Sequence, residues 1–373
     1  MSKKYHIIVF GCQMNISDAE RIASVLESVE YKETPNIKEA DLIVVTMCSV
    51  RQSAVDRVHW LAHKFSSLHK KKPATILTGC VLKKDKKYFE TGFDYIVDIK
   101  DIKKLSKIAK QQTFCRPQDT SVPDSRKKIL LQGDYLDITP KYSSKSSAYV
   151  PIMTGCNNFC SYCVVPYTRG REVSRPAKEI IAEVKKIVGT NPPSQSSGEA
   201  KEIWLLGQNV NSYKGEVSFP KLLKSINDIP GNFKLNFTSS HPKDFSDDLI
   251  ETMVKCKKLS RDLNLPIQSG DDTVLKRMNR PYTVLQYKNL VKRIRKAIPD
   301  IRLSTDIIVG FPGETKKQFK NTVKTLREIG YGVAFINKYS PRAGTAAAKL
   351  KDNVSWAEKK RREKALIDLI NAR

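Results

Sequence analysis

The sequence has no long apolar run. Nowhere in its 373 residues does a stretch approach the roughly 18 consecutive apolar residues of a membrane-spanning helix. The first apolar run, residues 5–10, is too short for the hydrophobic part of a secretion signal, and no small-residue cleavage site follows it. We therefore expect a cytoplasmic protein without a membrane span.

Acidic residues are scarce relative to basic ones. Asp and Glu together number 39 against 66 Lys and Arg, which gives a formal charge of +27 at pH 7. Such a charge is typical of proteins that bind nucleic acid, because Lys and Arg displace the counterions condensed on its phosphates. The alternative is a lysine-biased composition that covers solvated faces. The charge favours nucleic acid without excluding that alternative.

Histidines and nucleotide-binding motifs are also few. The chain has five histidines, and it shows no internal repeat, no P-loop and no well-placed G-x-G-x-x-G. Eight cysteines are present. In a cytosolic protein, cysteines are more often metal ligands or buried thiols than parts of a disulfide framework. The cysteines are therefore the first candidates for a metal site.

Residues 1–111 alternate apolar runs with helical stretches, as in a parallel sheet wound with helices on both faces. The predicted strands are residues 5–10, 41–46, 74–78 and 94–97, and the predicted helices are residues 16–30, 49–68, 83–89 and 102–111. Ligands of such sheets bind at the carboxyl ends of the strands. Cys12, Cys48 and Cys80 each follow one of the first three strands, so we expect them to meet in a shared metal centre. A buried structural thiol is the alternative for any one of them.

Residues 112–147 lose this periodicity and are predicted to be a linker. We assign no role to Cys115 within it, nor to Cys256, where a half-buried thiol is expected. Residues 148–373 resume the alternation, with predicted strands at residues 148–153, 202–206, 234–239, 263–267, 302–309 and 333–339 and helices near residues 177–188, 219–227, 246–257, 271–278, 284–297, 315–329 and 354–371. The predicted fold class is α/β: a doubly wound parallel domain followed by a partial (β/α)6 barrel.

A second cysteine group follows the first strand of this barrel. Cys156, Cys160 and Cys163 are spaced C-x3-C-x2-C, and no fourth cysteine or histidine nearby closes the site. Structural zinc requires four protein ligands. A four-iron cluster held by three thiolates leaves one iron open, and thiolate ligands suit iron–sulfur chemistry. Two triplets favour two open clusters over one closed site.

The C-x3-C-x2-C loop at the start of a partial barrel resembles the radical S-adenosylmethionine superfamily. The segments around Cys12, Cys48 and Cys80 resemble the N-terminal domain of its methylthiotransferase family. The resemblance implies two 4Fe-4S clusters and two S-adenosyl-L-methionine molecules per turnover, one that methylates sulfur at the auxiliary cluster and one that supplies the 5′-deoxyadenosyl radical. It also implies that Gly207, Gln268 and Gly310, at predicted strand ends, contact this cofactor; taken alone, each is an ordinary turn.

Residues 165–176, 206–213 and 238–242 are similar to the MiaB-type subfamily, whose substrate is the N6-isopentenyladenosine at position 37 of tRNA, next to the anticodon. The product is the 2-methylthio derivative. Alternatives with the same chemistry are threonylcarbamoyl-adenosine of tRNA (MtaB-like) and an aspartate of a ribosomal protein (RimO-like). A third alternative is a non-catalytic nucleic-acid-binding protein in which zinc or the clusters have only a structural role. The resemblance further implies an electron donor of the flavodoxin or ferredoxin kind, a sulfur or cluster donor, and a monomer.

Residues within and after the second triplet add candidate contacts. Arg169, Arg171 and Arg175 can clamp phosphate or the cofactor carboxylate, with salt bridges as the alternative, and we place Arg169 in the catalytic set with Cys156, Cys160 and Cys163. Phe159, Tyr162 and Tyr167 can stack on a flipped base or simply pack. His241 is expected to be a satisfied core histidine. The family continues into a tRNA-binding TRAM barrel after its radical domain, and we expect that barrel to be absent from this sequence, which ends at residue 373. The alternatives are a fragment of a longer protein and a short form that binds tRNA with its basic surface alone.

Overall fold

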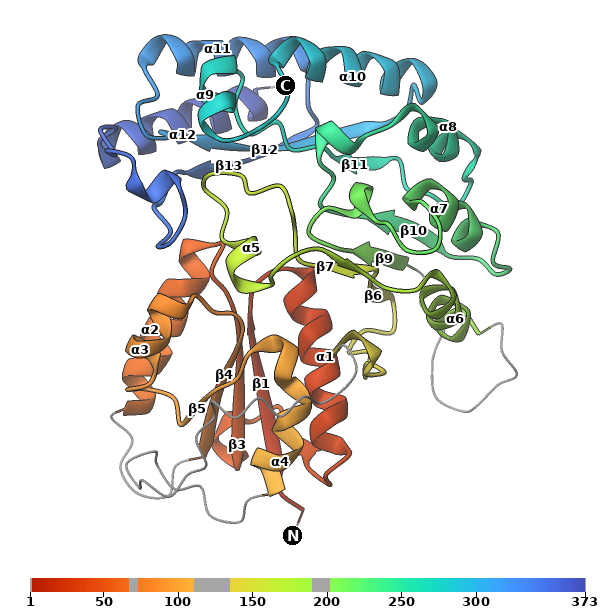
Figure 1. Cartoon of the computed structure of the whole chain (residues 1–373), viewed down its shortest axis with the longest axis vertical. Coiled ribbons are helices and arrows are strands. Elements are labelled where there is room, and N and C mark those ends of the chain that lie inside the picture. Colours follow the sequence, from red (N-terminus) through yellow and green to blue (C-terminus); the bar gives the residue numbers. More distant parts are fainter. Residues whose placement is uncertain (1, 67–72, 111–134, 190–201, 373) are drawn as a thin grey trace. The chain divides into compact units, whose positions relative to one another are not determined.

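The computed structural model describes residues 2–66, 73–110, 135–189 and 202–372 (Figure 1). Most of the predicted linker, including Cys115, lies outside these residues. The chain divides into two compact units. Unit 1 comprises Met1–Ser143 together with Tyr167–Arg169, and unit 2 comprises Ser144–Pro166 and Gly170–Arg373. A short segment of the later chain thus belongs with the N-terminal unit.

Unit 1 is built on a five-stranded parallel sheet with the order β2-β1-β3-β4-β5. The strands are β1 (Lys4–Phe10), β2 (Lys32–Glu33), β3 (Leu42–Cys48), β4 (Ala74–Cys80) and β5 (Tyr95–Ile96), and the helices are α1 (Gln13–Glu27), α2 (Gln52–Ser66), α3 (Lys83–Phe89) and α4 (Leu105–Lys110). Helices α1 and α4 cover one face of the sheet, and α2 and α3 cover the other (Figure 1). The prediction of a doubly wound sheet is confirmed.

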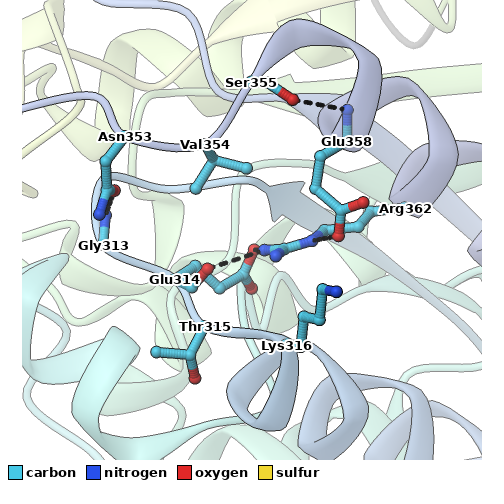
Figure 2. A pocket seen from close by; sticks show the side chains of 9 residues that line it. All are labelled: Gly313, Glu314, Thr315, Lys316, Asn353, Val354, Ser355, Glu358 and Arg362. Atoms are coloured by element: carbon cyan, nitrogen blue, oxygen red, sulfur yellow. Dashed lines mark hydrogen bonds and ion pairs between the residues drawn. The ribbon is translucent and has the colours of Figure 1, made fainter.

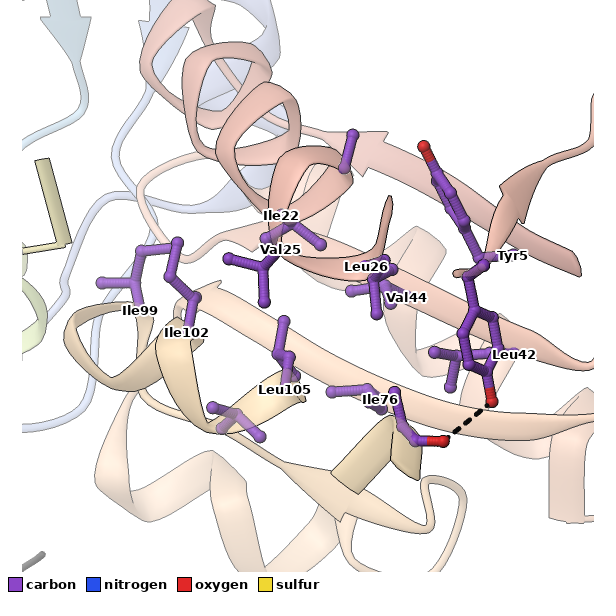
Figure 3. Close-up of a cluster of buried hydrophobic side chains, with 14 of the residues drawn as sticks. Tyr5, Ile22, Val25, Leu26, Leu42, Val44, Ile76, Ile99, Ile102 and Leu105 are labelled. Atoms are coloured by element: carbon purple, nitrogen blue, oxygen red, sulfur yellow. Dashed lines mark hydrogen bonds between the residues drawn. The ribbon is translucent and has the colours of Figure 1, made fainter. Parts of the chain in front are cut away.

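Strand β3 is buried on both sides, which explains its uninterrupted apolar sequence. Leu42 and Val44 belong to the core shared with α1 and α4, drawn in Figure 3, whereas Ile43 and Val45 belong to the core shared with α2 and α3. Alternate side chains of a strand point to opposite faces. One strand therefore contributes to both cores and fixes the position of its last residue, Cys48.

The starts of three predicted helices of unit 1 were wrong by three residues. Helix α4 begins at Leu105 rather than residue 102, after a 3-10 helix over Ile99–Lys104. The other two starts differ for a local reason. Helix α1 begins at Gln13 rather than residue 16, because Cys12 is its N-cap and the Asn15 side chain bonds back to the Cys12 backbone. Helix α2 begins at Gln52 rather than residue 49, because Ser49 donates both its backbone N–H and its hydroxyl to the Cys80 carbonyl. Both exceptions lie beside the cysteines.

The described part of unit 2 contains six parallel strands in two groups of three, with the orders β10-β9-β6 and β11-β12-β13. The strands are β6 (Ser147–Pro151), β9 (Glu202–Leu206), β10 (Lys234–Phe237), β11 (Asp262–Asn264), β12 (Arg302–Val309) and β13 (Val333–Lys338). Leu259, just before β11, pairs in parallel with Leu235 of β10 and links the two groups. Among the described strands β6 and β13 do not pair, so the barrel is open, as predicted.

The helices of unit 2 follow its strands. They are α6 (Ala177–Ile187), α7 (Phe219–Asn227), α8 (Asp247–Lys255), α9 (Asp272–Arg277), α10 (Val284–Ala297), α11 (Lys316–Ile329) and α12 (Trp356–Asn371). A short antiparallel pair, β7 (Met153–Thr154) with β8 (Val173–Ser174), and the short helix α5 (Val165–Thr168) were not predicted from the sequence. The β7–β8 pair closes the base of the loop that carries the second cysteine triplet. In the described part of the chain, no helix is long and apolar enough to cross a bilayer.

Candidate cysteine centres

The three cysteines of unit 1 lie together at the carboxyl edge of its sheet. Cys12 follows β1, and Cys48 and Cys80 are the last residues of β3 and β4, where they are direct partners in the parallel register. A hydrogen bond between the Cys12 and Cys48 side chains lowers the pKa of the Cys12 thiol to about 6 and raises that of Cys48. Burial raises the pKa of Cys80. The strand-end positions predicted from the sequence thus place all three residues at one edge.

Asn15 is hydrogen-bonded to two of the three cysteine-bearing segments and lies close to the third. It is fully buried; its Oδ1 accepts from the Cys12 N–H at 3.2 Å and its Nδ2 donates to the Met47 carbonyl at 3.3 Å. Gly79, before Cys80, has φ +98°, and a Cβ there would lie 2.5 Å from the Met47 carbonyl oxygen and 3.2 Å from Asn15 Nδ2. The backbone at Gly79 therefore approaches β3 more closely than any side chain allows.

Arg169 lies in unit 1, in contact with this triplet. Its Nε donates to the Cys80 Sγ at 3.0 Å, its Nη2 is 2.5 Å from Asp18 Oδ2, and its Nη1 donates to the Tyr135 hydroxyl at 3.0 Å. The side chains of Arg169 and Asp18 are only 2% and 1% exposed. The sequence predicts Arg169 in the catalytic set, as a clamp for phosphate or cofactor; in the structure each of its three nitrogens binds a group of unit 1.

Asp18 and Tyr135 were not singled out in the sequence, although Asp18 carried a signal. On α1, Asn15, Asp18 and Ile22 follow one another at helical spacing and are all buried. A carboxylate on the apolar face of a helix is rarely buried without a cationic partner. The position of Asp18 therefore predicts a cationic partner, although no feature of the neighbouring sequence identifies that partner as Arg169.

The second triplet occupies the loop between β7 and β8. The Cys156 N–H bonds to the Gly170 carbonyl at 3.2 Å, and the Cys163 N–H bonds to the Cys160 carbonyl at 2.9 Å. Ser161 anchors the loop to the end of α9: its N–H donates to the Met278 carbonyl at 3.0 Å and its hydroxyl to the Arg277 carbonyl at 2.8 Å. Burial raises the pKa of Cys156, and it raises the pKa of Cys163 to about 12.

A buried arginine also contacts the second triplet. Arg280 is 6% exposed, and its Nη1 donates to the Cys160 Sγ at 3.5 Å. Its Nη2 donates to the Pro266 carbonyl and its Nε to the Tyr282 hydroxyl, both at 2.8 Å. Each triplet is therefore accompanied by one buried guanidinium whose position is fixed by other hydrogen bonds.

The donor sets fit iron–sulfur clusters better than single ions. Within the described residues, no group of three or more His, Cys, Asp or Glu is arranged to hold one metal ion. A single zinc ion requires its sulfurs about 2.3 Å from one point, whereas a four-iron cluster distributes its thiolates over separate irons. A nearby guanidinium offsets part of the charge that three thiolates bring to a cluster. The all-sulfur triplets and their arginines are compatible with such clusters.

The predicted cofactor residues lie at strand ends of unit 2, and packing explains two of them. A Cβ at Gly207 would lie 2.6 Å from Met153 Cγ, and a Cβ at Gly310, where φ is +69°, would overlap the Lys359 side chain. Gln268 has φ +72° and pairs in parallel with Ile307. The two glycines are thus required whether or not a ligand is present.

Unit 2 also contains buried polar atoms that no group of the described chain satisfies. Eight of them lie at the carboxyl ends of β7, β9 and β10: Thr154 Oγ1, Gln208 Oε1, Asn209 Oδ1, both amide atoms of Asn211, Asn236 Nδ2, Ser240 Oγ and His241 Nε2. A buried polar atom without a partner costs about 1–3 kcal/mol. Such a cluster fits a polar ligand that supplies the missing partners.

His241 shows which kind of group one of these atoms offers. Its Nδ1 accepts from the Lys243 N–H at 3.2 Å, so in the neutral ring the proton is on Nε2. Burial, with the positive charges of Arg280 and Lys243, lowers the pKa of His241 to about 2, so the ring is neutral. His241 is buried as expected, but it presents an unused N–H donor.

The remaining candidates have separate positions. The Arg171 guanidinium lies 4.4 Å from the centre of the Phe159 ring, and Arg175 pairs with Glu183 at 2.7 Å. Tyr162 packs against a small buried cluster, whereas Tyr167 is 47% exposed. Cys256 is buried at 1% exposure, so the expectation of a half-buried thiol was wrong.

Gly155 and Gly189 form a matched pair for testing the loop of the second triplet. Both have a left-handed backbone, with φ +78° and +77°, but a Cβ at Gly155 would overlap the Arg171 carbonyl, whereas one at Gly189 meets no atom of the described residues within 4 Å. Gly189→Ala should cost about 1–2 kcal/mol of unfolding free energy for the backbone alone. Gly155→Ala should cost about 1–3 kcal/mol more and lower the iron content. Denaturant unfolding and iron analysis measure both, and equal effects would contradict the close approach.

A separate pocket of about 260 Å³ lies where α11 and α12 begin (Figure 2). Its walls are residues 313–316 and 353–355 with Glu358 and Arg362. Arg362 bonds to Glu314 at 2.7 Å and to Glu358 at 2.8 Å, and the Gly313 N–H donates to Asn353 at 2.8 Å. The wall groups thus satisfy one another, and we assign this pocket no ligand.

Comparisons with known proteins agree with the two units. Residues 150–326 match the radical SAM superfamily, and residues 4–99 match the uncharacterized protein family UPF0004. The protein of Carboxydothermus hydrogenoformans named tRNA-2-methylthio-N(6)-dimethylallyladenosine synthase is 40% identical over 99% of this chain and 83% of its own length. A protein of the same name from Clostridium botulinum is 41% identical over 99% of this chain and 81% of its own length.

A solved structure has a similar fold. The cobalamin-dependent S-adenosylmethionine radical enzyme OxsB, with aqua-cobalamin bound, superposes with a TM-score of 0.59 over 100% of this chain and 56% of that chain, at 10% sequence identity. At that identity the likeness concerns the fold alone.

Proposed function

Because the chain belongs to the radical S-adenosylmethionine family of tRNA methylthiotransferases, we propose that it methylthiolates C2 of N6-isopentenyladenosine at position 37 of tRNA. The observation that carries the proposal is the pair of cysteine triplets. Each lies within one unit, and each has a buried arginine that donates to one of its sulfurs. The triplet of unit 2 would hold the centre that forms the radical, and the triplet of unit 1 would hold the centre that carries the transferred sulfur.

Family membership brings S-adenosyl-L-methionine and one 4Fe-4S cluster, and we assign that cluster to Cys156, Cys160 and Cys163. Bound there with the cofactor, it supplies a carbon radical able to remove hydrogen from the electron-poor C2 of adenine, which acid–base chemistry cannot readily do. The unsatisfied atoms near Asn209, Asn236 and His241 are positioned to bind the cofactor's polar groups. Gln268 is a further candidate contact. Burial of these groups keeps water from the site.

We assign a second 4Fe-4S cluster to Cys12, Cys48 and Cys80, with the role of carrying the sulfur that is methylated and transferred. Support comes from the strand-end geometry and from Asn15, which holds two of the three segments in place. Two S-adenosyl-L-methionine molecules are then used in each turnover, one for the methyl group and one for the radical.

The partners follow from this chemistry. The anticodon loop of tRNA is the substrate; the net charge of +27 suits its phosphates, and the exposed Tyr167 ring suits stacking on an unpaired base. An electron donor of the flavodoxin or ferredoxin kind and a sulfur or cluster donor complete the reaction. We propose a monomer in the cytoplasm, where tRNA is found.

The test is a reaction with defined tRNA. The chain, reconstituted with iron and sulfide without oxygen, is incubated with S-adenosyl-L-methionine, a reductant and tRNA that carries N6-isopentenyladenosine, and the digested nucleosides are analysed by mass spectrometry. We expect the 2-methylthio nucleoside. Product formed only from threonylcarbamoyl-adenosine tRNA, or only from a ribosomal protein, would replace this substrate with one of those alternatives.

Iron analysis of the same preparation tests the third alternative, a non-catalytic nucleic-acid-binding protein with structural metal. A brown protein with about eight irons, the sum of two four-iron clusters, agrees with the enzyme. A colourless protein that contains zinc would overturn it.

A further inference from the structure

We propose that Arg169 is a positioning residue for the cluster at Cys12, Cys48 and Cys80: it fixes Cys80 and raises the cluster's reduction potential, and Asp18 limits that increase. The inference rests on the proposed second cluster. It changes the role expected for Arg169 from a substrate or cofactor clamp to a residue that adjusts the electronic properties of a cluster.

The geometry leaves the guanidinium little freedom. Its nitrogens bind Cys80, Asp18 and Tyr135, at 3.0, 2.5 and 3.0 Å respectively. A guanidinium is planar and always charged. With Nη1 and Nη2 held by Tyr135 and Asp18, the direction of the Nε–H toward the Cys80 sulfur is determined. A lysine could supply the charge but not this fixed direction.

Stability alone is a weak reason for such an arrangement. Removing two charges from water often costs as much as their attraction returns, so apolar side chains of similar volume serve a core equally well. Here the buried pair is 2% and 1% exposed, and one of its N–H groups is directed at a proposed metal ligand. Hydrogen bonds to cluster sulfurs and nearby charges are established controls of cluster potential.

The sign of the effect follows from the charges. Reduction adds an electron to the cluster, so a positive charge and an N–H donor at Cys80 favour the reduced state and raise the potential. The Asp18 carboxylate opposes this effect. The Arg169 Nε–H contacts the Cys80 Sγ directly at 3.0 Å, whereas the Asp18 carboxylate bonds to the Nη atoms of the same guanidinium. The net effect of the pair is therefore an increase in potential.

The experiment isolates this cluster in the full chain. Cys156, Cys160 and Cys163 are replaced by alanine, the protein is reconstituted without oxygen, and its iron content is measured; about four irons are expected from one four-iron cluster. The midpoint potential is then obtained by redox titration followed by electron paramagnetic resonance. Arg169→Gln should shift it to a more negative value, and Asp18→Asn to a more positive value. Arg169→Lys, which keeps the charge, should give a midpoint between those of Arg169→Gln and the parent.

Arg171→Gln is the matched control, because Arg171 lies in the same segment but is exposed and rests on Phe159; its midpoint should equal that of the parent. Opposite shifts for Arg169→Gln and Asp18→Asn are what a merely structural ion pair cannot produce. Shifts of the same sign, or unchanged midpoints at full iron content, overturn the inference. If Arg169→Gln cannot hold iron, Asp18→Asn decides alone. If the parent protein itself holds no iron, the proposal of a second cluster at Cys12, Cys48 and Cys80 is wrong.

Discussion

Replacing Cys156 with alanine is expected to abolish formation of 5′-deoxyadenosine and of the methylthiolated nucleoside together. Cys156 is one of three thiolates that we assign to the radical cluster, and no fourth cysteine or histidine lies near them in the sequence. A cluster held by only three protein ligands cannot lose one of them and remain intact. Anaerobic turnover, with both products measured by mass spectrometry, checks the result.

Cys48→Ala should behave differently, because Cys48 belongs to the other triplet. Methylthiolation should fall to background while cofactor cleavage continues and the iron content drops by about four. Cys256→Ala is the control: it removes a thiol that is 1% exposed but belongs to neither triplet, so both activities should remain. Equal and complete loss of cleavage in Cys48→Ala and Cys156→Ala, with circular dichroism showing that both are folded, would contradict the division of labour.

Glu314→Ala should lower the unfolding free energy of the protein by about 3–5 kcal/mol, because it leaves the Arg362 charge buried with less compensation. The two side chains are 1% and 3% exposed, and Arg362 Nη1 lies 2.7 Å from Glu314 Oε2. The same carboxylate accepts from the Gly310 N–H at 2.6 Å. The substitution therefore removes a buried ion pair and releases the turn that follows β12. Denaturant unfolding measures the change.

Asp368→Ala provides the comparison for an exposed pair. Asp368 bonds to Lys364 on the same helix, α12, with side chains 57% and 77% exposed. Solvent-exposed pairs contribute about 0–1 kcal/mol, so its loss should be close to the error of the measurement. Similar costs for Glu314→Ala and Asp368→Ala would show that burial does not decide the strength of these pairs.

Local sequence signals were enough to predict the fold. Apolar runs such as β3 and amphipathic stretches such as α11 have periods that identify strands and helices, and their alternation predicted parallel sheets in both units. The strand-end positions of Cys12, Cys48 and Cys80 followed from the same periodicity. Each of these predictions depends on residues within a few positions of one another.

Features fixed by distant residues were not predictable in this way. Arg169 is paired with Asp18, a residue 151 positions away, and Ser161 is anchored by Met278. The two-residue strands β7 and β8 are too short to show a period, although they close the loop of the second triplet. The start of α1 was displaced because a cysteine, which is not a usual N-cap residue, begins that helix.

The membership of Tyr167–Arg169 in unit 1 bears on how this family can be dissected and recombined. A fragment that ends at residue 143 omits Arg169 and leaves Asp18 without its cation. A chimera that takes its N-terminal unit from a relative must therefore also take the three residues 167–169, since compatibility at that position is set by Asp18 and Tyr135. Unit 1 can therefore be exchanged between relatives only by exchanging two separate segments of the sequence, the N-terminal one and residues 167–169.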